Sequence, residues 1–135
     1  LGIEKSAAPL LIRVFLGLSA LVWLPYGLYC FAQPGYLAEA AGVAAASTTG
    51  SVELRAMYGG LQVAIGALAL AGALTAALRR PALVALAFLC AGLFVARAVA
   101  AVGSAELSGY TAVALGFELV SAGLAAGALA LGRGA

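Results

Sequence analysis

The chain has 135 residues, of which 65% are hydrophobic and 9% charged, and its formal net charge is +2. Soluble domains average about 45 to 50% apolar and about 25% charged residues, so this composition excludes an ordinary soluble domain and indicates a membrane protein. The small, dispersed charge gives no reason to expect a nucleic acid partner. Histidine and aspartate are absent, so we expect no metal site, no cofactor and no Ser/His/Asp or Cys/His catalytic arrangement.

A helix needs about 20 apolar residues to cross about 30 Å of hydrocarbon. The chain holds four apolar segments of about that length, joined by one long and two short connectors. We therefore predict a single all-α domain, residues 1–135: an integral membrane bundle of four antiparallel helices. Its predicted spans cover residues 9–31, 52–78, 81–102 and 108–131, and the long connector covers residues 32–51.

The first half of the chain carries several boundary signals. Pro9 suits the start of the first span, and Pro25 is free to kink its far end. In the connector, an alanine-rich stretch at residues 37–46 predicts a short interfacial helix. Ser51 is the expected cap of the second span, with Glu53 in its first turn, where a carboxylate offsets the helix dipole.

In the second half, Pro81 is expected to open the third span directly after Arg79 and Arg80. A short turn then leads to the fourth span, with Ser108 as its expected cap. Because the connectors after the second and third spans are short, their helices should be antiparallel neighbours.

The fixed charges predict the orientation of this bundle, because cytoplasmic connectors of membrane proteins are enriched in Lys and Arg. In the four-span topology one side carries the basic residues Lys5, Arg79, Arg80 and Arg133. The connectors on the other side carry Glu39 and Glu106 and no basic residue. We therefore expect both termini in the cytoplasm.

Four charged residues lie inside the predicted spans: Arg13, Arg55, Arg97 and Glu118. A charge that faces lipid costs about 2.5 to 3.5 kcal/mol on insertion scales, so such residues normally face a partner, a polar cavity or the interface. The helical rise places Arg55, Arg97 and Glu118 in the outer half of the bundle, whereas Arg13 enters from the cytoplasmic side.

The segment Glu-Leu-Arg-Ala-Met-Tyr-Gly-Gly-Leu-Gln, which opens the second span, adds further polar residues. In an α-helix, positions i, i+3, i+4 and i+7 share one face, and here they hold Arg55, Tyr58, Gly59 and Gln62. We expect this stripe to face the interior of the bundle.

Two compatible interpretations of the polar residues stay open. In the first, the charges form a neutral internal network that fixes helix register, with Arg13 and Glu53 as members. In the second, they form a polar pocket in the outer half. Its ligand-binding residues would be Arg55, Tyr58, Gln62, Arg97, Glu118, Trp23 and Tyr26, with Tyr29 beside them. An excess of arginine there would suit an anionic or carbonyl-bearing ligand.

Two other patterns have a simpler structural interpretation. The tyrosines near the outer face, Tyr36 and Tyr110 included, are typical of an interfacial aromatic belt. Small residues four apart, such as Gly123 and Gly127, permit close helix packing, within one bundle rather than between two copies.

Several of these segments together resemble a family of small uncharacterised bacterial four-helix membrane proteins, a domain of unknown function akin to the DoxX-like membrane group. They are the second-span segment, Leu-Phe-Val-Ala-Arg-Ala-Val around Arg97, Gly-Phe-Glu-Leu-Val around Glu118, Arg13 and the Pro-Gly turn. The resemblance covers nearly the whole chain and implies a multi-pass protein of the bacterial inner membrane. It also implies a binding or accessory role, because the wider group includes a small subunit of a quinone-linked oxidoreductase and a receptor-assembly chaperone. The turn Val102-Gly103-Ser104 departs from the Asp-Gly pattern of such relatives.

Three functional hypotheses follow. The leading one is a non-catalytic membrane protein, an accessory or assembly subunit, that binds a lipid-like or quinone-like molecule, a membrane-protein partner or a second copy. A small transporter or exporter that uses Glu118 is the alternative from another class. A membrane-embedded enzyme is the least favoured, because Glu118 would be its one well-placed acid or base. Membrane lipids are expected partners in each case.

Overall fold

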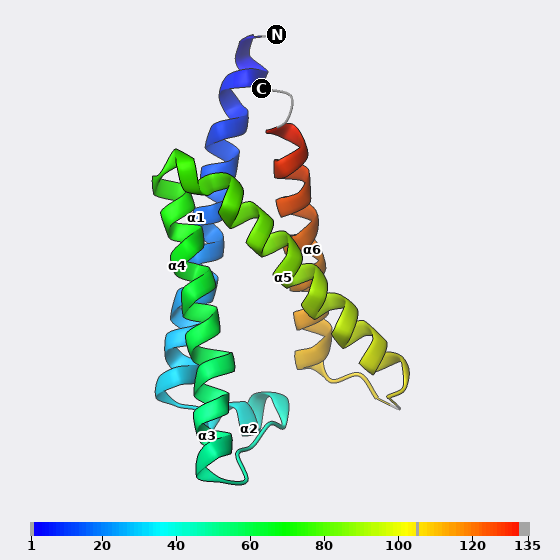
Figure 1. Cartoon of the computed structure of the whole chain (residues 1–135). Coiled ribbons are helices and arrows are strands. Elements are labelled where there is room, and N and C mark those ends of the chain that lie inside the picture. Colours follow the sequence, from blue (N-terminus) through cyan, green and yellow to red (C-terminus); the bar gives the residue numbers. More distant parts are fainter. Residues whose placement is uncertain (1, 105, 133–135) are drawn as a thin grey trace.

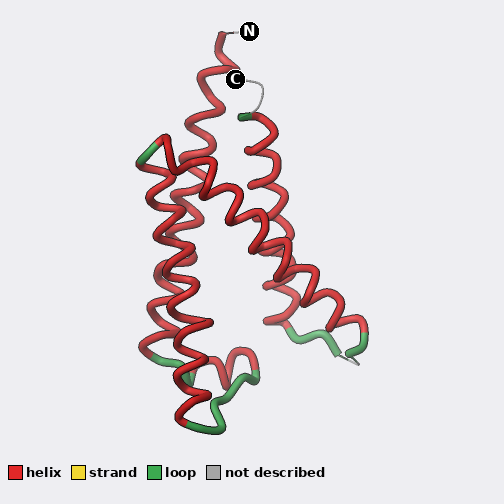
Figure 2. Tube along the Cα trace, in the orientation of Figure 1, coloured by secondary structure: helices red, strands yellow, loops and turns green. Residues whose placement is uncertain are grey.

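The computed structural model describes residues 2–104 and 106–132, with side chains from Ala7 onward. Across these residues the chain forms helices and turns and no strand, so the all-α prediction is confirmed (Figure 2). Four helical stretches are long and apolar enough to cross a membrane: Ala7–Ala32, Thr48–Leu74, Ala76–Val102 and Gly109–Leu131. The chain therefore has the features of a multi-pass membrane protein.

The long helices alternate in direction along the chain (Figure 1). Helix α1 (Gly2–Ala32) is followed by the short α2 (Tyr36–Ala41). The second apolar stretch is continuous but has three parts: α3 (Thr48–Leu54), a π-helical segment η1 (Arg55–Gly60) and α4 (Leu61–Leu74). Helices α5 (Ala76–Val102) and α6 (Gly109–Leu131) complete the fold. Helix α1 starts and α6 ends at the same end of the molecule, which we call the terminal end. Helix α2 lies at the opposite end, which we call the connector end.

The start of the second span lies earlier than expected. Ser47 rather than Ser51 is the cap, because its hydroxyl accepts a hydrogen bond from the Gly50 backbone N–H at 3.1 Å. The helix then begins at Thr48, within the stretch 32–51 that was predicted as a connector. The cap expected for the last span is confirmed, since Ser108 accepts from the backbone N–H of Thr111 at 3.2 Å.

The break between the second and third spans also differs from the prediction. It lies at the extended residue Thr75, so the second span ends at Leu74 and α5 begins at Ala76. Pro81 lies in the second turn of α5, where its missing N–H removes one backbone hydrogen bond without ending the helix. Arg79 and Arg80 are therefore helical residues rather than part of a connector.

The helices form two pairs that diverge. Helix α1 packs along η1 and α4, and α5 packs along α6, while α4 joins the pairs by its contact with α5. Helices α1 and α6 make few contacts with each other. In Figure 1, α5 and α6 incline away from α1 and α4 toward the connector end.

Glycine allows α1 and α4 to approach closely. A Cβ atom added to Gly27 would lie 2.8 Å from the backbone nitrogen of Val63, and one on Gly66 would lie 2.8 Å from that of Leu24. By contrast, Gly123 and Gly127 have no atom within 4 Å of such a Cβ atom, so they do not mediate the expected close packing within the chain. The small-residue interface is made by α1 and α4 instead.

The apolar core lies between the pairs at and below the terminal end. Its buried residues come from α1, α4, α5 and α6. They include Leu16, Ala20, Ala69, Ala73, Leu83, Leu86 and Ala125. Many large hydrophobic side chains point outward instead; Phe88 is 79% exposed and Val99 is 70% exposed. An apolar exterior of this extent is expected where lipid is the solvent.

The close contact of α1 and α4 yields a test. Gly27→Ala should destabilise the fold by about 1 to 3 kcal/mol, because the added methyl group overlaps backbone atoms that cannot yield. The matched control is Gly17→Ala on the same helix, where nothing lies within 4 Å and the change should stabilise the helix by about 0.5 to 1 kcal/mol. Unfolding in mixed micelles measures both. Equal effects of the two changes would contradict the packing described.

Candidate functional site

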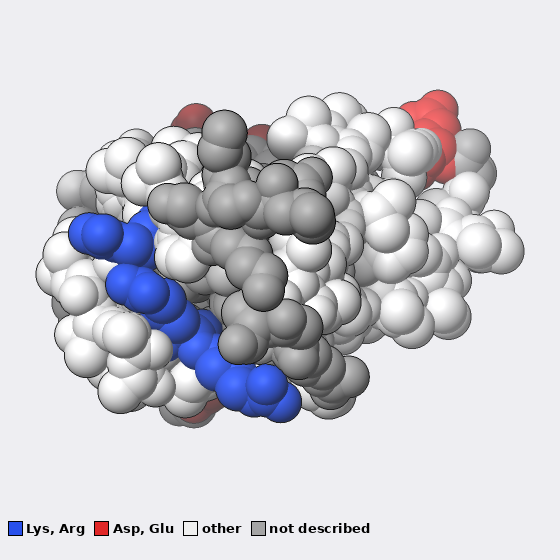
Figure 3. Space-filling view, turned by 90° about the horizontal axis from the view of Figure 1, so that it is seen from above, with Lys and Arg blue, Asp and Glu red and all other residues white. Residues whose placement is uncertain are grey.

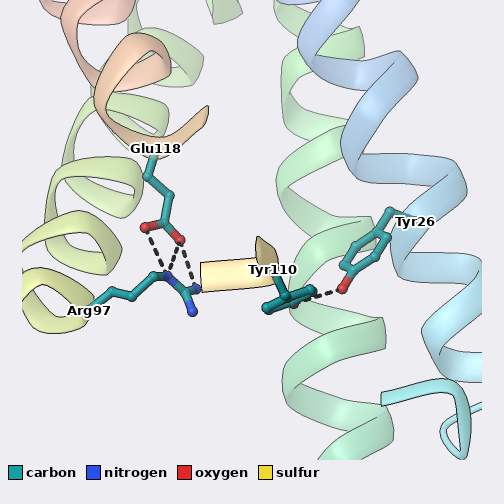
Figure 4. Close-up of polar contacts among 4 residues, drawn as sticks. All are labelled: Tyr26, Arg97, Tyr110 and Glu118. Atoms are coloured by element: carbon teal, nitrogen blue, oxygen red, sulfur yellow. Dashed lines mark hydrogen bonds and ion pairs between the residues drawn. The ribbon is translucent and has the colours of Figure 1, made fainter. Parts of the chain in front are cut away.

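The one ion pair among the described residues joins α5 to α6 (Figure 4). Nε of Arg97 donates to both carboxylate oxygens of Glu118, at 3.2 Å and 3.1 Å, and Nη2 donates to Oε1 at 2.8 Å. The Glu118 side chain is 4% exposed, whereas that of Arg97 is 30% exposed. The carboxylate is thus covered, and part of the guanidinium stays accessible.

This ion pair belongs to the wall of a cavity of about 690 Å³. Ligand sites in proteins are typically about 300 to 1,000 Å³, so the volume suits a small molecule. All four long helical stretches contribute side chains. The lining residues are Val22, Trp23, Tyr26, Met57, Tyr58, Leu61, Gln62, Leu89, Leu93, Arg97, Gly109, Tyr110, Val113, Ala114, Phe117 and Glu118. Most are apolar, so the few polar groups would decide how a ligand is oriented.

Two tyrosines bridge the helix pairs at the connector end. The hydroxyl groups of Tyr26 on α1 and Tyr110 on α6 lie 3.0 Å apart and form a hydrogen bond (Figure 4). The Tyr36 ring packs edge-on against both Tyr26 and Tyr29, with ring centroids 6.5 Å and 5.1 Å away. Because α1 and α6 make few other contacts, this hydroxyl pair is the direct polar link across the cavity.

Arg55 does not line this cavity. Its Nη1 donates to the backbone carbonyl of Phe31, one of the last carbonyls of α1, and its guanidinium lies 5.7 Å from the centroid of the Phe31 ring. The reason is the π-helical segment, whose wider turn changes the angle between the residues on either side of it. Tyr58 and Gln62 face the cavity, but the stripe expected for an ideal α-helix does not continue back to Arg55.

Arg13 makes the equivalent contact at the terminal end. Its Nε donates to the carbonyl of Ala73 at 3.2 Å, within the last turn of α4. The last four carbonyls of a helix have no partner within the helix, and a positive charge there also interacts favourably with the helix dipole. Arg13 on α1 therefore caps α4, and Arg55 at the start of the returning span caps α1. We call these contacts the reciprocal arginine caps.

The embedded charges thus fall into two groups. The reciprocal caps use Arg13 and Arg55, and neither of them reaches Glu118. Glu53, expected in a charge network with Arg55, is exposed and has no ion pair within the described part of the chain. The cavity keeps one arginine and one glutamate, so its wall is neutral. The excess of arginine expected from the sequence is absent there.

Five further residues predicted for the pocket have a clear position. Trp23, Tyr26, Tyr58 and Gln62 line the cavity beside Arg97 and Glu118, whereas Tyr29 packs on Tyr36 outside it. Sequence reasoning missed Tyr110, which was assigned to an aromatic belt, and Phe117. Helical periodicity counted back from Glu118 finds this face, because Ala114 and Tyr110 precede Glu118 by four and eight residues, and Phe117 follows Tyr110 by seven.

The fold and cavity together define a class: a four-helix protein of membrane-protein character with one buried ion pair in a mainly apolar cavity. The chain belongs to the family described as a domain of unknown function (DUF4345), which matches residues 11–129. That range includes every cavity residue named above. No curated protein and no solved structure shows significant similarity to the chain.

The Arg97–Glu118 pair predicts an asymmetry between its two single variants. Arg97→Met should cost about 3 to 5 kcal/mol, because it leaves a covered carboxylate without a partner. Glu118→Met should cost less, because Arg97 is partly exposed and can turn toward the cavity. The double variant should recover most of the loss. Thermal unfolding in micelles measures all three, and additive losses would contradict a coupled pair.

The reciprocal arginine caps predict two independent losses. Arg13→Met and Arg55→Met should each cost about 1 to 2 kcal/mol, because each leaves a helix-terminal carbonyl without its charged donor. Since the two caps lie at opposite ends of the α1–α4 pair, the losses should add to within about 0.5 kcal/mol. Exposed Arg80→Met is the control and should have little effect. Equal stability of all variants would show that the caps contribute nothing.

Proposed function

We propose that this protein is a non-catalytic multi-pass membrane protein that holds a neutral lipid-like or quinone-like molecule in the cavity between its helix pairs. The supporting observation is the hydrogen bonding of the Arg97 guanidinium. Its Nε and Nη2 donate to the carboxylate of Glu118, whereas its Nη1 makes no hydrogen bond within the described residues. Arg97 lines the cavity, so its remaining N–H groups are available to an acceptor oxygen of a ligand.

The balance of charge favours a neutral ligand. Glu118 already neutralises Arg97, so an anion in this cavity would lack a counter-charge, and transfer of an unpaired charge into an apolar site is costly. A carbonyl or ester oxygen accepts a hydrogen bond from the guanidinium without adding charge. The surrounding apolar side chains, such as Leu89, Leu93 and Val113, suit the hydrocarbon part of the same molecule.

The other hypotheses make different demands on the same residues. A transporter that uses Glu118 needs the carboxylate to exchange its partner during each cycle, which the three donor contacts from Arg97 oppose. An enzyme needs a free acid or base, and the cavity wall offers no carboxylate besides this paired one. A membrane-protein partner, or a second copy of the chain, that inserts an apolar side chain into the cavity is the closest variant of the binding proposal.

The proposed setting is the bacterial inner membrane, in line with the resemblance to small bacterial proteins akin to the DoxX-like group. The proposed orientation places the terminal end in the cytoplasm. Arg79 and Arg80 lie at that end, and Figure 3 shows a band of arginine side chains across it, with the acidic side chains toward the margin of the view. Lys5 and Arg133 belong to the same charge argument, but the Lys5 side chain and Arg133 lie outside the described residues.

Binding in the cavity is tested by filling it. Ala114 lines the cavity and Ala112, on the same helix, is exposed and does not. In native mass spectra of gently purified protein, the wild type and Ala112→Phe should carry a bound lipid-like molecule. Ala114→Phe should lose at least about tenfold in occupancy, because the ring takes the ligand's volume. The same adduct on both variants, or none on the wild type, would count against the proposal.

The orientation is tested by labelling introduced cysteines with a membrane-impermeant maleimide applied to intact cells. Ala46→Cys, in the long connector, should react from outside, and Ala76→Cys, at the start of α5, should react only after the cells are opened. Both native cysteines are 0% exposed and so provide an unlabelled background. Labelling of Ala76→Cys from outside would reverse the proposed orientation.

A further inference from the structure

Two polar atoms of residues in the cavity wall have no hydrogen-bond partner within the described residues. They are the indole nitrogen Nε1 of Trp23 and the amide oxygen Oε1 of Gln62. The indole N–H is only a donor, and the amide oxygen is only an acceptor. Trp23 is 7% exposed, so its N–H is not satisfied by bulk solvent. Buried polar groups without partners are rare in folded proteins and call for an explanation.

Both side chains come from the close α1–α4 contact. A Cβ atom on Gly66 would lie 3.1 Å from Cβ of Trp23, and Gln62 precedes Gly66 by about one helical turn. The donor and the acceptor therefore arise at neighbouring levels of one wall, and Arg97 and Glu118 belong to the other pair of helices. The indole ring packs on Phe117 of α6, with ring centroids 5.8 Å apart, and this neighbour has no nitrogen or oxygen acceptor for the N–H.

A hydroxyl group matches both needs, because it accepts one hydrogen bond and donates another. A carbonyl or ether oxygen accepts from Trp23 and leaves Gln62 without a donor. A carboxylate has the same fault and adds charge to a neutral wall. We infer that the cavity selects a neutral amphiphile through a hydroxyl group that accepts from Trp23 and donates to Gln62. This inference rests on the proposed function and adds the chemistry of the group that is recognised.

The wall can adjust around such a group. Met57 lines the cavity beside Tyr58 and Gln62, and its unbranched thioether side chain rearranges at low cost. The hydroxyl then replaces apolar atoms next to the two unpaired groups, which removes the penalty that they carry. A ligand that lacks the hydroxyl proton leaves the Gln62 oxygen unpaired, and sites built for a hydroxyl discriminate strongly against such analogues.

The experiment compares two probes that differ by one methyl group, para-dodecylphenol and its methyl ether. The phenol both donates and accepts, whereas the ether only accepts. Native mass spectrometry of detergent-solubilised protein measures both affinities, and the single tryptophan reports binding by its fluorescence in the wild type. The phenol should bind the wild type at least about tenfold more tightly than the ether, because the ether leaves a buried acceptor unpaired.

Two variants separate the donor from the acceptor. Gln62→Met removes the acceptor at similar volume, so it should weaken the phenol about tenfold and leave the ether unchanged. Trp23→Phe removes the donor that both probes use, so it should weaken both by a similar factor. Thermal unfolding checks that each variant is folded, and Ala114→Phe should bind neither probe.

The outcomes distinguish the two levels of the proposal. Equal affinity of the wild type for phenol and ether, or an equal loss of both in Gln62→Met, would overturn hydroxyl recognition and leave cavity binding intact. Failure of the wild type to bind either probe, or undiminished binding to Ala114→Phe, would overturn cavity binding and this inference with it.

Discussion

An arginine inside an apolar bundle must find an acceptor, because hydrocarbon offers none and an unpaired charge there is costly. The acceptor it finds decides what each arginine of this protein does. Arg13 and Arg55 lie close to the ends of neighbouring helices, where backbone carbonyls lack partners within the helix, and they take those carbonyls. Arg97, in the penultimate turn of α5, pairs with Glu118 instead. The contacts within the helix pairs and the charge of the cavity wall both depend on which acceptor each arginine takes.

The reciprocal arginine caps and the glycine contacts act on the same pair of helices. Glycine lets α1 and α4 approach until backbone atoms meet, and an arginine at each end satisfies carbonyls that this apolar contact cannot. The α5–α6 pair carries the ion pair instead, and α1 and α6 meet through the hydroxyls of Tyr26 and Tyr110 and through the rings of Trp23 and Phe117. The two pairs diverge from each other and leave a cavity between them that is mainly apolar, has no net charge and carries few polar groups.

Much of the architecture could be predicted from the sequence. Four apolar segments, the helix cap at Ser108 and the end of α5 at Val102 all follow from local patterns, because helix formation and capping depend on nearby residues. The break at Thr75 was harder, because Pro81 is a strong local signal but a helix tolerates it near its start. The π-helical turn is not visible in apolar periodicity, and it is why Arg55 lies away from Tyr58 and Gln62.

The sequence by itself determined the four apolar helices and the presence of embedded charges, because composition and helical period are local properties of the chain. The tertiary structure decided which charge pairs with which group. In the folded chain Glu118 pairs with Arg97 alone, and Arg13 and Arg55 donate to carbonyls at helix ends. This pairing depends on the distance between the helices and on the π-helical turn. It also placed the unpaired groups of Trp23 and Gln62 in one cavity wall, because only packing brings residues so far apart in the chain together.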